Sequence, residues 1–121
     1  MRVILADDQT DVRSAMRLLL EEAHGISIIG EVCTMSDLVR QVKINTPDLI
    51  LLDWELPGIK AQDVVAFLGT QYPHLAVIAL SSSPQARRAA LETGVLAFVS
   101  KSDPPESLLN AINKCRRERS V

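Results

Sequence analysis

The sequence predicts an α/β domain in which a parallel β-sheet is covered by helices on both faces. Short runs of apolar residues alternate five times with segments whose apolar residues recur at helical spacing. Strict alternation of strands and helices is typical of this fold class. The composition agrees, because 121 residues with 47% hydrophobic and 23% charged residues are ordinary for one globular domain. We therefore expect a single domain over residues 1–121.

The strands are predicted from continuous apolar runs. Runs of four to eight such residues are typical of strands buried on both faces of a sheet. The third run ends at Asp53, and the alternation makes its strand central. The five predicted strands cover residues 3–6, 26–33, 49–52, 75–80 and 96–99.

The first three helices are predicted from apolar periodicity. Residues 11–23 place apolar side chains on one side of a helix and charged side chains on the other. Shorter helical patterns occur around residues 38–42 and 64–68. Pro47 ends the second of these helices, because the residue before a proline disfavours helical geometry.

The last two helices are predicted from their caps. Pro84 is expected at the first position of the fourth helix, and Gly94 follows its end. Asp103 is expected to cap the fifth helix, whose apolar stripe reaches Cys115. Residues 116–121 are polar and basic, and we expect them to fray.

Charge and hydropathy exclude several function classes. A net charge of −2 disfavours a dedicated nucleic-acid binder, which normally carries a basic patch. No apolar run approaches the roughly 18–20 residues that span a bilayer, and the N-terminal run is too short for a signal peptide. We therefore expect no membrane association and a location in the cytoplasm. The two histidines and two cysteines are scattered and form no zinc-binding pattern.

Polar residues follow four of the predicted strands. Asp7 and Asp8 follow the first strand, Asp53 the third, Ser81 the fourth and Lys101 the fifth. Because ligands of open α/β sheets bind at the carboxyl ends of the strands, we expect these side chains to converge. An aspartate after a strand is often only a helix cap or turn former, and a lone serine or lysine there carries almost no information. Their conjunction predicts a functional site.

Three adjacent carboxylates and one ammonium suit phosphoryl chemistry. The carboxylates repel one another and raise one another's pKa unless a cation neutralises them. Oxygen ligands of this kind favour Mg²⁺ or Mn²⁺, and Lys101 would supply a second positive charge to a phosphoryl group. One carboxylate could act as a nucleophile and form an aspartyl phosphate. We expect this to be Asp53, because its strand is central.

The chain resembles a response regulator receiver domain (CheY-like) of the NarL/FixJ, or LuxR-type, subgroup. The resemblance covers essentially the whole chain and implies a flavodoxin-like fold with strand order 2-1-3-4-5. The segment Lys-Ser-Asp-Pro-Pro-Glu from Lys101 onward is similar to that subgroup. The general receiver motif consists of Asp7-Asp8, Asp53 followed by Pro57-Gly58, Ser81, Phe98 and Lys101.

The resemblance implies that Asp53 accepts a phosphoryl group from a sensor histidine kinase or phosphotransfer protein. Mg²⁺ (or Mn²⁺) would be held by Asp8 and Asp53, by the carbonyl of Glu55 and, partly through water, by Asp7. Lys101 would pair with Asp53 and then with its phosphoryl oxygens. Beyond its own phosphoryl transfer and autodephosphorylation, no enzyme activity is expected.

The resemblance also implies a switch. Ser81 would move to hydrogen-bond the phosphoryl group, and Phe98 would turn inward behind it. This movement would alter the surface of the fourth helix, fifth strand and fifth helix and control a transcriptional output. DNA would be bound only through a C-terminal domain that this chain does not include. An excised receiver is favoured over a stand-alone one.

Oligomeric state is left open. Receivers of this type often pair, and the sequence offers charged residues for the face of a homodimer. Exposed ion pairs contribute little stability each, so they do not decide whether a dimer forms. The candidate residues are Arg87, Arg88, Glu92 and Asp103.

Two departures from the family pattern matter. Glu55 places an extra negative charge at the mouth of the site, where it could slow attack by phosphodonors or water or touch the metal. Phe98 stands where tyrosine is commoner, so any hydrogen bond from that hydroxyl is lost.

Three alternative functions compete with this interpretation of the sequence. A phosphatase of the haloacid dehalogenase type would need its nucleophile after the first strand. A carrier of FMN would need a phosphate-binding loop where Asp7-Asp8 would repel phosphate. A receiver-like interaction module would never be phosphorylated. An enzyme would turn over a small phosphoester, and a receiver would label itself with a phosphoryl group. An adaptor would do neither.

Overall fold

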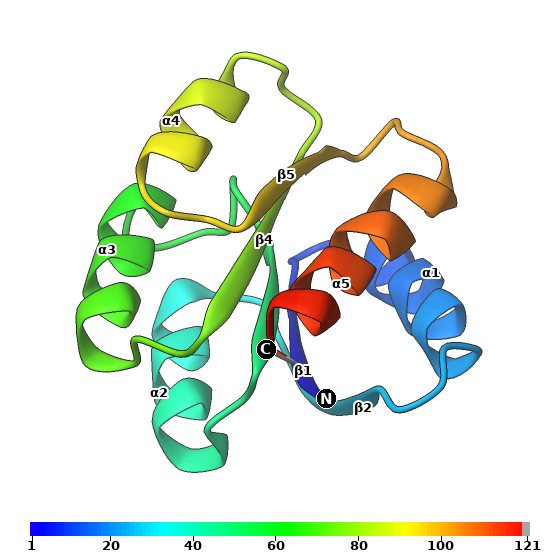
Figure 1. Cartoon of the computed structure of the whole chain (residues 1–121). Coiled ribbons are helices and arrows are strands. Elements are labelled where there is room, and N and C mark those ends of the chain that lie inside the picture. The colour runs from blue at the N-terminus through cyan, green and yellow to red at the C-terminus, as the bar shows by residue number, and fades with distance from the viewer. Residues whose placement is uncertain (120–121) are drawn as a thin grey trace.

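The computed structural model describes residues 1–119 and contains one five-stranded parallel sheet (Figure 1). The strand order is β2-β1-β3-β4-β5, so β1, β3 and β4 are interior strands. The predicted fold class and strand order are therefore confirmed. The strands are β1 (Arg2–Ala6), β2 (Ser27–Val32), β3 (Leu49–Asp53), β4 (Ala76–Ser81) and β5 (Ala97–Ser100).

The helices cover both faces of the sheet. Figure 1 shows α1 and α5 on one side and α2, α3 and α4 on the other. Two separate clusters of buried apolar residues correspond to these two sides. The helices are α1 (Thr10–Glu21), α2 (Met35–Asn45), α3 (Ala61–Gln71), α4 (Ala86–Glu92) and α5 (Pro105–Arg119).

Alternation along the interior strands builds the two cores. In β3, Leu49 and Leu51 pack toward α1 and α5, whereas Ile50 and Leu52 pack toward α2, α3 and α4. Successive side chains of a strand point to opposite faces, so a strand covered on both sides is apolar throughout. Asp53 continues this strand and is also buried.

The start of α2 was predicted too late. Thr34 is its N-cap, and its hydroxyl accepts a hydrogen bond of 3.2 Å from the Asp37 amide. Met35 in the first turn is fully buried. The apolar pattern around residues 38–42 therefore marks only the middle of the helix.

The prediction of Pro84 at the first position of α4 was wrong. Ser81 still belongs to β4, and Pro84 lies in a turn in which the Ala86 amide donates to the Ser83 carbonyl at 3.1 Å. The helix begins at Ala86 without a side-chain cap. The strand therefore ends one residue later, and the helix begins two residues later, than the turn residues indicated.

The start of α5 also differs from the prediction. Asp103 does not cap the helix with its side chain, because its carboxylate accepts a hydrogen bond of 3.0 Å from the Ser100 amide. This bond closes the turn that leads out of β5. Pro105 is the first helical residue, a position where the missing amide of proline costs nothing.

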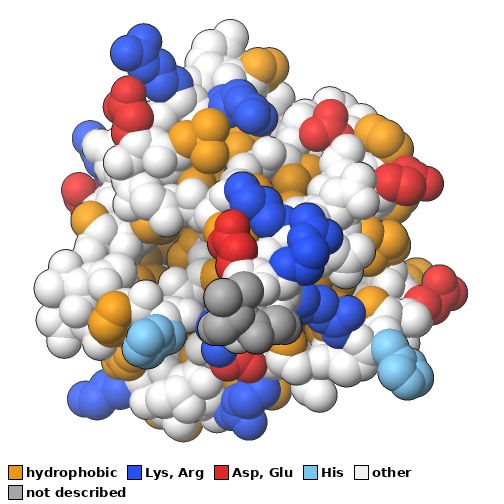
Figure 2. Space-filling view, in the orientation of Figure 1, with side chains coloured by type: hydrophobic (Ala, Val, Ile, Leu, Met, Phe, Trp, Pro, Cys, Tyr) orange, Lys and Arg blue, Asp and Glu red, His pale blue; other side chains and the backbone are white. Residues whose placement is uncertain are grey.

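The expected fraying of residues 116–121 is wrong for the described part. The helix continues to Arg119, whose guanidinium contacts the Asp48 carboxylate at 2.7 Å and donates to the His74 carbonyl at 2.8 Å. Figure 2 shows Lys and Arg side chains gathered over this end of α5. Residues 120 and 121 lie outside the described residues.

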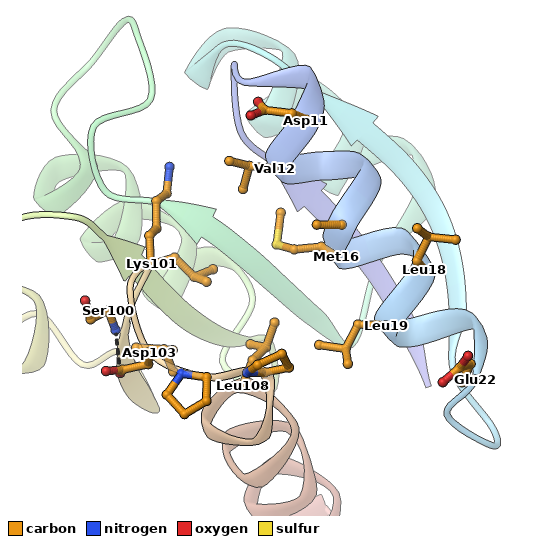
Figure 3. A pocket seen from close by; sticks show the side chains of 15 residues that line it. Asp11, Val12, Met16, Leu18, Leu19, Glu22, Ser100, Lys101, Asp103 and Leu108 are labelled. Atoms are coloured by element: carbon orange, nitrogen blue, oxygen red, sulfur yellow. Dashed lines mark hydrogen bonds between the residues drawn. The ribbon is translucent and has the colours of Figure 1, made fainter.

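An open groove of about 510 Å³ lies between α1 and the segment that joins β5 to α5 (Figure 3). Val12, Met16 and Leu19 of α1 face Leu108 of α5 across it, so its walls are largely apolar. Lys101 lies at one end, and the groove therefore reaches the carboxyl edge of the sheet. Over residues 1–119, no helix combines the length and apolar character that a membrane span requires.

Candidate functional site

The ends of four strands position the predicted site residues. Asp7 follows β1, Asp53 ends β3, Ser81 ends β4 and Lys101 follows β5. Backbone hydrogen bonds continue the sheet beyond the strands, including one of 2.9 Å from the Lys101 amide to the Ser81 carbonyl. The backbone of the site is therefore fixed by the sheet itself.

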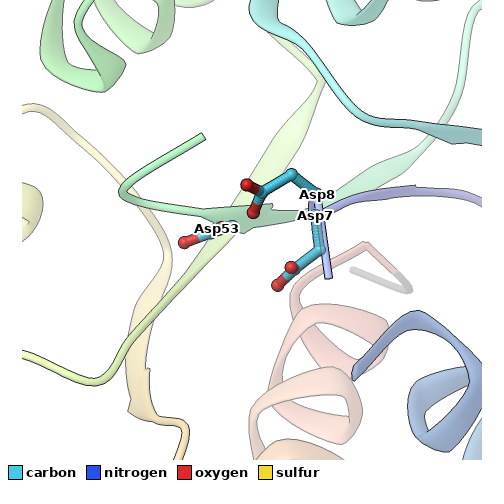
Figure 4. A group of neighbouring side chains, drawn as sticks. All are labelled: Asp7, Asp8 and Asp53. Atoms are coloured by element: carbon cyan, nitrogen blue, oxygen red, sulfur yellow. The ribbon is translucent and has the colours of Figure 1, made fainter. Parts of the chain in front are cut away.

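Three carboxylates converge at this edge (Figure 4). One oxygen from each of Asp7, Asp8 and Asp53 lies within 4.8 Å of the others. Asp7 is fully buried and Asp53 is 3% exposed, whereas Asp8 is exposed. The structure thus brings together the three acids that the sequence singled out. One of them faces solvent.

Lys101 is the cation nearest this cluster among the described residues. Its ammonium nitrogen lies 2.8 Å from the Asp7 carboxylate and 3.4 Å from that of Asp53. It also donates a hydrogen bond of 3.2 Å to the side-chain carbonyl of Gln9. The predicted pairing with Asp53 is present, but the shorter contact is to Asp7, and the contact with Gln9 was not predicted.

Burial and charge act on the pKa values in this cluster. Burial raises the pKa of Asp53 above its usual value, and the charge of Asp7 raises it further. The Glu55 amide, which donates to Asp53 at 3.0 Å, and the Lys101 ammonium only partly offset this. Burial lowers the pKa of Lys101, but hydrogen bonding to Asp7 and the charges of both acids raise it overall. Lys101 therefore stays protonated at neutral pH.

The residues fit a divalent cation. Three carboxylates face one ammonium, so the cluster carries an excess of negative charge in a largely buried setting. Such an excess is costly unless a cation neutralises it, and a set of oxygen donors suits Mg²⁺ or Mn²⁺. The roles assigned to the individual aspartates and to the Glu55 carbonyl stay predictions.

Ser81 is engaged by Glu55. Its hydroxyl donates to the two carboxylate oxygens of Glu55, which lie at 2.8 and 2.9 Å. It also accepts a hydrogen bond of 2.9 Å from the Ser83 amide. The charge of Glu55 at the mouth of the site was predicted, but this contact was not. The signal for it lies in the sheet register, because the pairing of Asp53 with Leu80 brings the following residues of both strands to one edge.

Phe98 lies one strand away from Ser81 and is half-buried. It packs against the apolar cluster beneath α2, α3 and α4. The guanidinium of Arg87 lies over its ring, 5.8 Å from the ring centroid. This cation–π contact ties α4 to β5, and the sequence did not predict it.

The charged residues proposed for a dimer face have contacts within the chain. Arg88 and Glu92 form an ion pair of 3.0 Å with each other along α4, and both are largely exposed. Arg87 contacts Phe98, and Asp103 accepts the hydrogen bond from Ser100. Exposed pairs of this kind contribute little, so the oligomeric state stays open.

The fold agrees with a match to a known protein family. Residues 3–113 match the response regulator receiver domain. The chain belongs to this family. The sequence-based resemblance is therefore confirmed, and the three acids and the lysine lie at the carboxyl edge of a receiver domain.

The receiver domain has LuxR-type relatives of known sequence and structure. The response regulator UvrY of Escherichia coli K12 is 28% identical over 112 residues, 91% of this chain and 51% of that protein. A putative transcriptional regulator of Pseudomonas aeruginosa is 32% identical over 112 residues, 91% of this chain and 54% of its own length. The chain thus spans about half the length of these curated relatives.

Solved structures show the same architecture. The isolated receiver domain of RcsB from Salmonella enterica serovar Typhimurium has a TM-score of 0.89 at 23% identity, covering 97% of this chain and 88% of that one. A LuxR-family DNA-binding response regulator from Staphylococcus aureus has a TM-score of 0.85 at 27% identity, covering 94% and 97% of the two chains.

Asp53→Asn is expected to stabilise the metal-free receiver domain at pH 7 by about 1 kcal/mol, or about 3–5 °C in Tm. The pKa of Asp53 is raised in the folded state. In the wild type, the contribution of this carboxyl to stability is therefore fully present below its unfolded pKa and is lost as pH rises through its folded pKa. The gain should therefore grow from acidic to neutral pH. Thermal unfolding in EDTA at several pH values measures it, and a gain independent of pH would contradict the stated cause.

Proposed function

We propose that this receiver domain is a phosphorylation-dependent switch of a two-component system, with Asp53 as the phosphoryl acceptor in a Mg²⁺-dependent reaction. The observation that supports this most directly is the placement of Asp53. Its carboxylate is almost fully buried at the sheet edge, between an ammonium and two further carboxylates. Its contacts with Lys101 and the Glu55 amide only partly offset burial and the charge of Asp7, so the pKa of this carboxyl is raised.

The transfer step is a displacement at phosphorus. A carboxylate oxygen of Asp53 attacks the phosphorus of a phosphohistidine on a sensor histidine kinase or phosphotransfer protein. The new O–P bond forms as the P–N bond breaks, and the imidazole nitrogen keeps the electron pair. Lys101 balances the negative charge on the phosphoryl oxygens, since it already reaches Asp53.

The bound metal would be held by Asp8, Asp53 and the carbonyl of Glu55, with Asp7 acting partly through water. Bound Mg²⁺ or Mn²⁺ would neutralise phosphoryl oxygens and so lower the repulsion between the donor and the carboxylates. Apart from this self-directed chemistry and autodephosphorylation, we propose no enzyme activity.

The output follows from the new charge at Asp53. A dianion attracts hydroxyl donors, and Ser81 is the nearest one on the adjacent strand. Movement of Ser81 leaves space beside β5, and Phe98 then turns inward. Because the Phe98 ring contacts Arg87, this turn would disturb the surface of α4, β5 and α5.

We propose that this surface controls a transcriptional output. The relatives that the chain matches are about twice as long and include a transcriptional regulator. DNA would then be bound through a separate C-terminal domain, and the switch would act in the cytoplasm, where its phosphodonor is available.

Intact-protein mass after incubation with acetyl phosphate tests the proposal. We expect the wild type to gain one phosphoryl group in Mg²⁺, with no gain in EDTA or in Asp53→Asn. If the wild type bound Mg²⁺ but gained no phosphoryl group, it would be a receiver that accepts phosphoryl groups only from its own protein donor. An unlabelled wild type that binds no Mg²⁺ would contradict the phosphorylation switch and favour a constitutive interaction module.

A further inference from the structure

We propose that Glu55 is a positioning residue that holds the Ser81 hydroxyl in the unphosphorylated domain and competes for it with the phosphoryl group. The proposal rests on the proposed function, because the competitor is the phosphoryl group on Asp53. It assigns to the Glu55 side chain a task separate from any contact of its backbone with a metal.

The hydrogen bonds of Ser81 support this assignment. A hydroxyl has one proton to donate, and here it points to a carboxylate whose two oxygens lie at 2.8 and 2.9 Å. A second acceptor, the Ser83 carbonyl, is farther away at 3.4 Å. Ser81 therefore cannot donate to a phosphoryl group without first leaving Glu55.

The two partners of this hydrogen bond differ in burial. Ser81 is fully buried, so its hydroxyl depends on protein partners rather than on water. Glu55 is exposed, so its carboxylate can return to solvent without a large penalty. The phosphoryl group can thus displace Glu55 at low cost.

Glu55 contacts the acceptor as well as the switch. Its backbone amide donates to a carboxylate oxygen of Asp53 at 3.0 Å, while its side chain accepts from Ser81. One residue thus joins the two groups that must meet after phosphorylation. Its carboxylate offers Ser81 what a phosphoryl group offers, namely anionic oxygen acceptors.

Simple charge repulsion is the competing explanation. A carboxylate at the mouth of the site would weaken the binding of any anion, whether or not it contacts Ser81. The two explanations differ when Ser81 is absent. Repulsion persists in Ser81→Ala, whereas competition for the hydroxyl disappears.

Thermal unfolding of the unphosphorylated protein tests the contact first. We expect Glu55→Ala to lower Tm by about 3 °C in the wild type and by less than about 1 °C in Ser81→Ala. Asp63→Asn, which removes an exposed carboxylate from α3, serves as the control for net charge. Equal effects in both backgrounds would overturn the proposal, whatever the outcome of the labelling experiment.

Beryllofluoride, a phosphoryl analogue, tests the competition. Its half-saturating concentration is measured in Mg²⁺ by the fluorescence of Trp54, the single tryptophan of the chain. Relative to the wild type, we expect about tenfold tighter binding in Glu55→Ala and about threefold in Glu55→Gln, because hydrogen bonds to charged groups are the stronger ones. In the Ser81→Ala background, removal of Glu55 should change binding less than twofold.

The outcomes separate the two proposals. An equal gain in both backgrounds would show charge repulsion and overturn the competition. A wild type that neither binds beryllofluoride nor gains mass with acetyl phosphate would contradict the proposed function and, with it, the competition. Coupling between Glu55 and Ser81 in both experiments supports the proposal.

Discussion

Lys101→Met is expected to slow labelling of Asp53 by acetyl phosphate about 100-fold, the usual effect of removing one group that stabilises charge in the transition state. The same substitution is expected to lower the free energy of unfolding by about 3 kcal/mol in EDTA, because it leaves buried carboxylates without their cation. The lysine is 14% exposed, and its two partners are almost fully buried. Mass spectrometry of the labelled protein and urea unfolding measure the two effects.

The stability loss in Lys101→Met should depend on pH. The pKa of Asp53 is already raised by burial, and loss of the ammonium raises it further. A group with a raised folded-state pKa stabilises the protein below its unfolded pKa and loses that contribution as pH rises. The loss should therefore be larger at pH 8 than at pH 5. Partial recovery on adding Mg²⁺ is expected, because a cation would replace the missing charge.

Lys114→Met is the matched control for this experiment. Lys114 is exposed on α5, has the same side chain and lies outside the site. Its substitution should change stability by less than about 0.5 kcal/mol and leave labelling intact. If Lys101→Met behaved like this control, the ion pairs with Asp7 and Asp53 would contribute nothing, and Lys101 would have no part in the transfer.

The sheet was predictable because its interior strands are buried on both faces. Such strands are continuous apolar runs, so a polar residue that ends one is easily recognised in the sequence. Leu49 to Leu52 followed by Asp53 is the clearest case. Apolar runs do not reveal which strands are neighbours, so the order 2-1-3-4-5 depended on the resemblance to receiver domains. The structure supplies it directly.

Helix starts were less predictable because turn residues have several uses. Ser83-Pro84 has the composition of a helix cap, yet it forms a turn before Ala86. Asp103 could cap α5, yet its carboxylate closes the turn from Ser100. In both cases a local hydrogen bond to another backbone amide or carbonyl competes with capping, and composition alone does not decide between them.

The site was predictable in its membership but not in its contacts. Asp7, Asp8, Asp53 and Lys101 do converge. The sequence does not show which of two adjacent aspartates is buried, and the structure buries Asp7 beside Lys101 and exposes Asp8. The bond between Ser81 and Glu55 joins residues 26 positions apart, so it depends on the sheet register.

Asp7→Asn and Asp8→Asn are expected to have different effects, although both remove one negative charge. Asp7 accepts from the Gln9 amide at 2.9 Å with one oxygen and contacts Lys101 with the other. An asparagine has only one oxygen for these two donors, so one is left unsatisfied. We expect Asp7→Asn to lower the free energy of unfolding by about 1–3 kcal/mol in EDTA.

Asp8→Asn should leave stability within about 0.5 kcal/mol of the wild type, because Asp8 is exposed. Its effect should appear in Mg²⁺ affinity, which we expect to fall at least about tenfold through the loss of a charged ligand. Calorimetric titration with Mg²⁺ and urea unfolding in EDTA separate the two properties. If Asp8→Asn bound Mg²⁺ like the wild type while Asp7→Asn did not, the buried aspartate would be the direct ligand. Lys101 would then have to yield its closest contact whenever the metal binds.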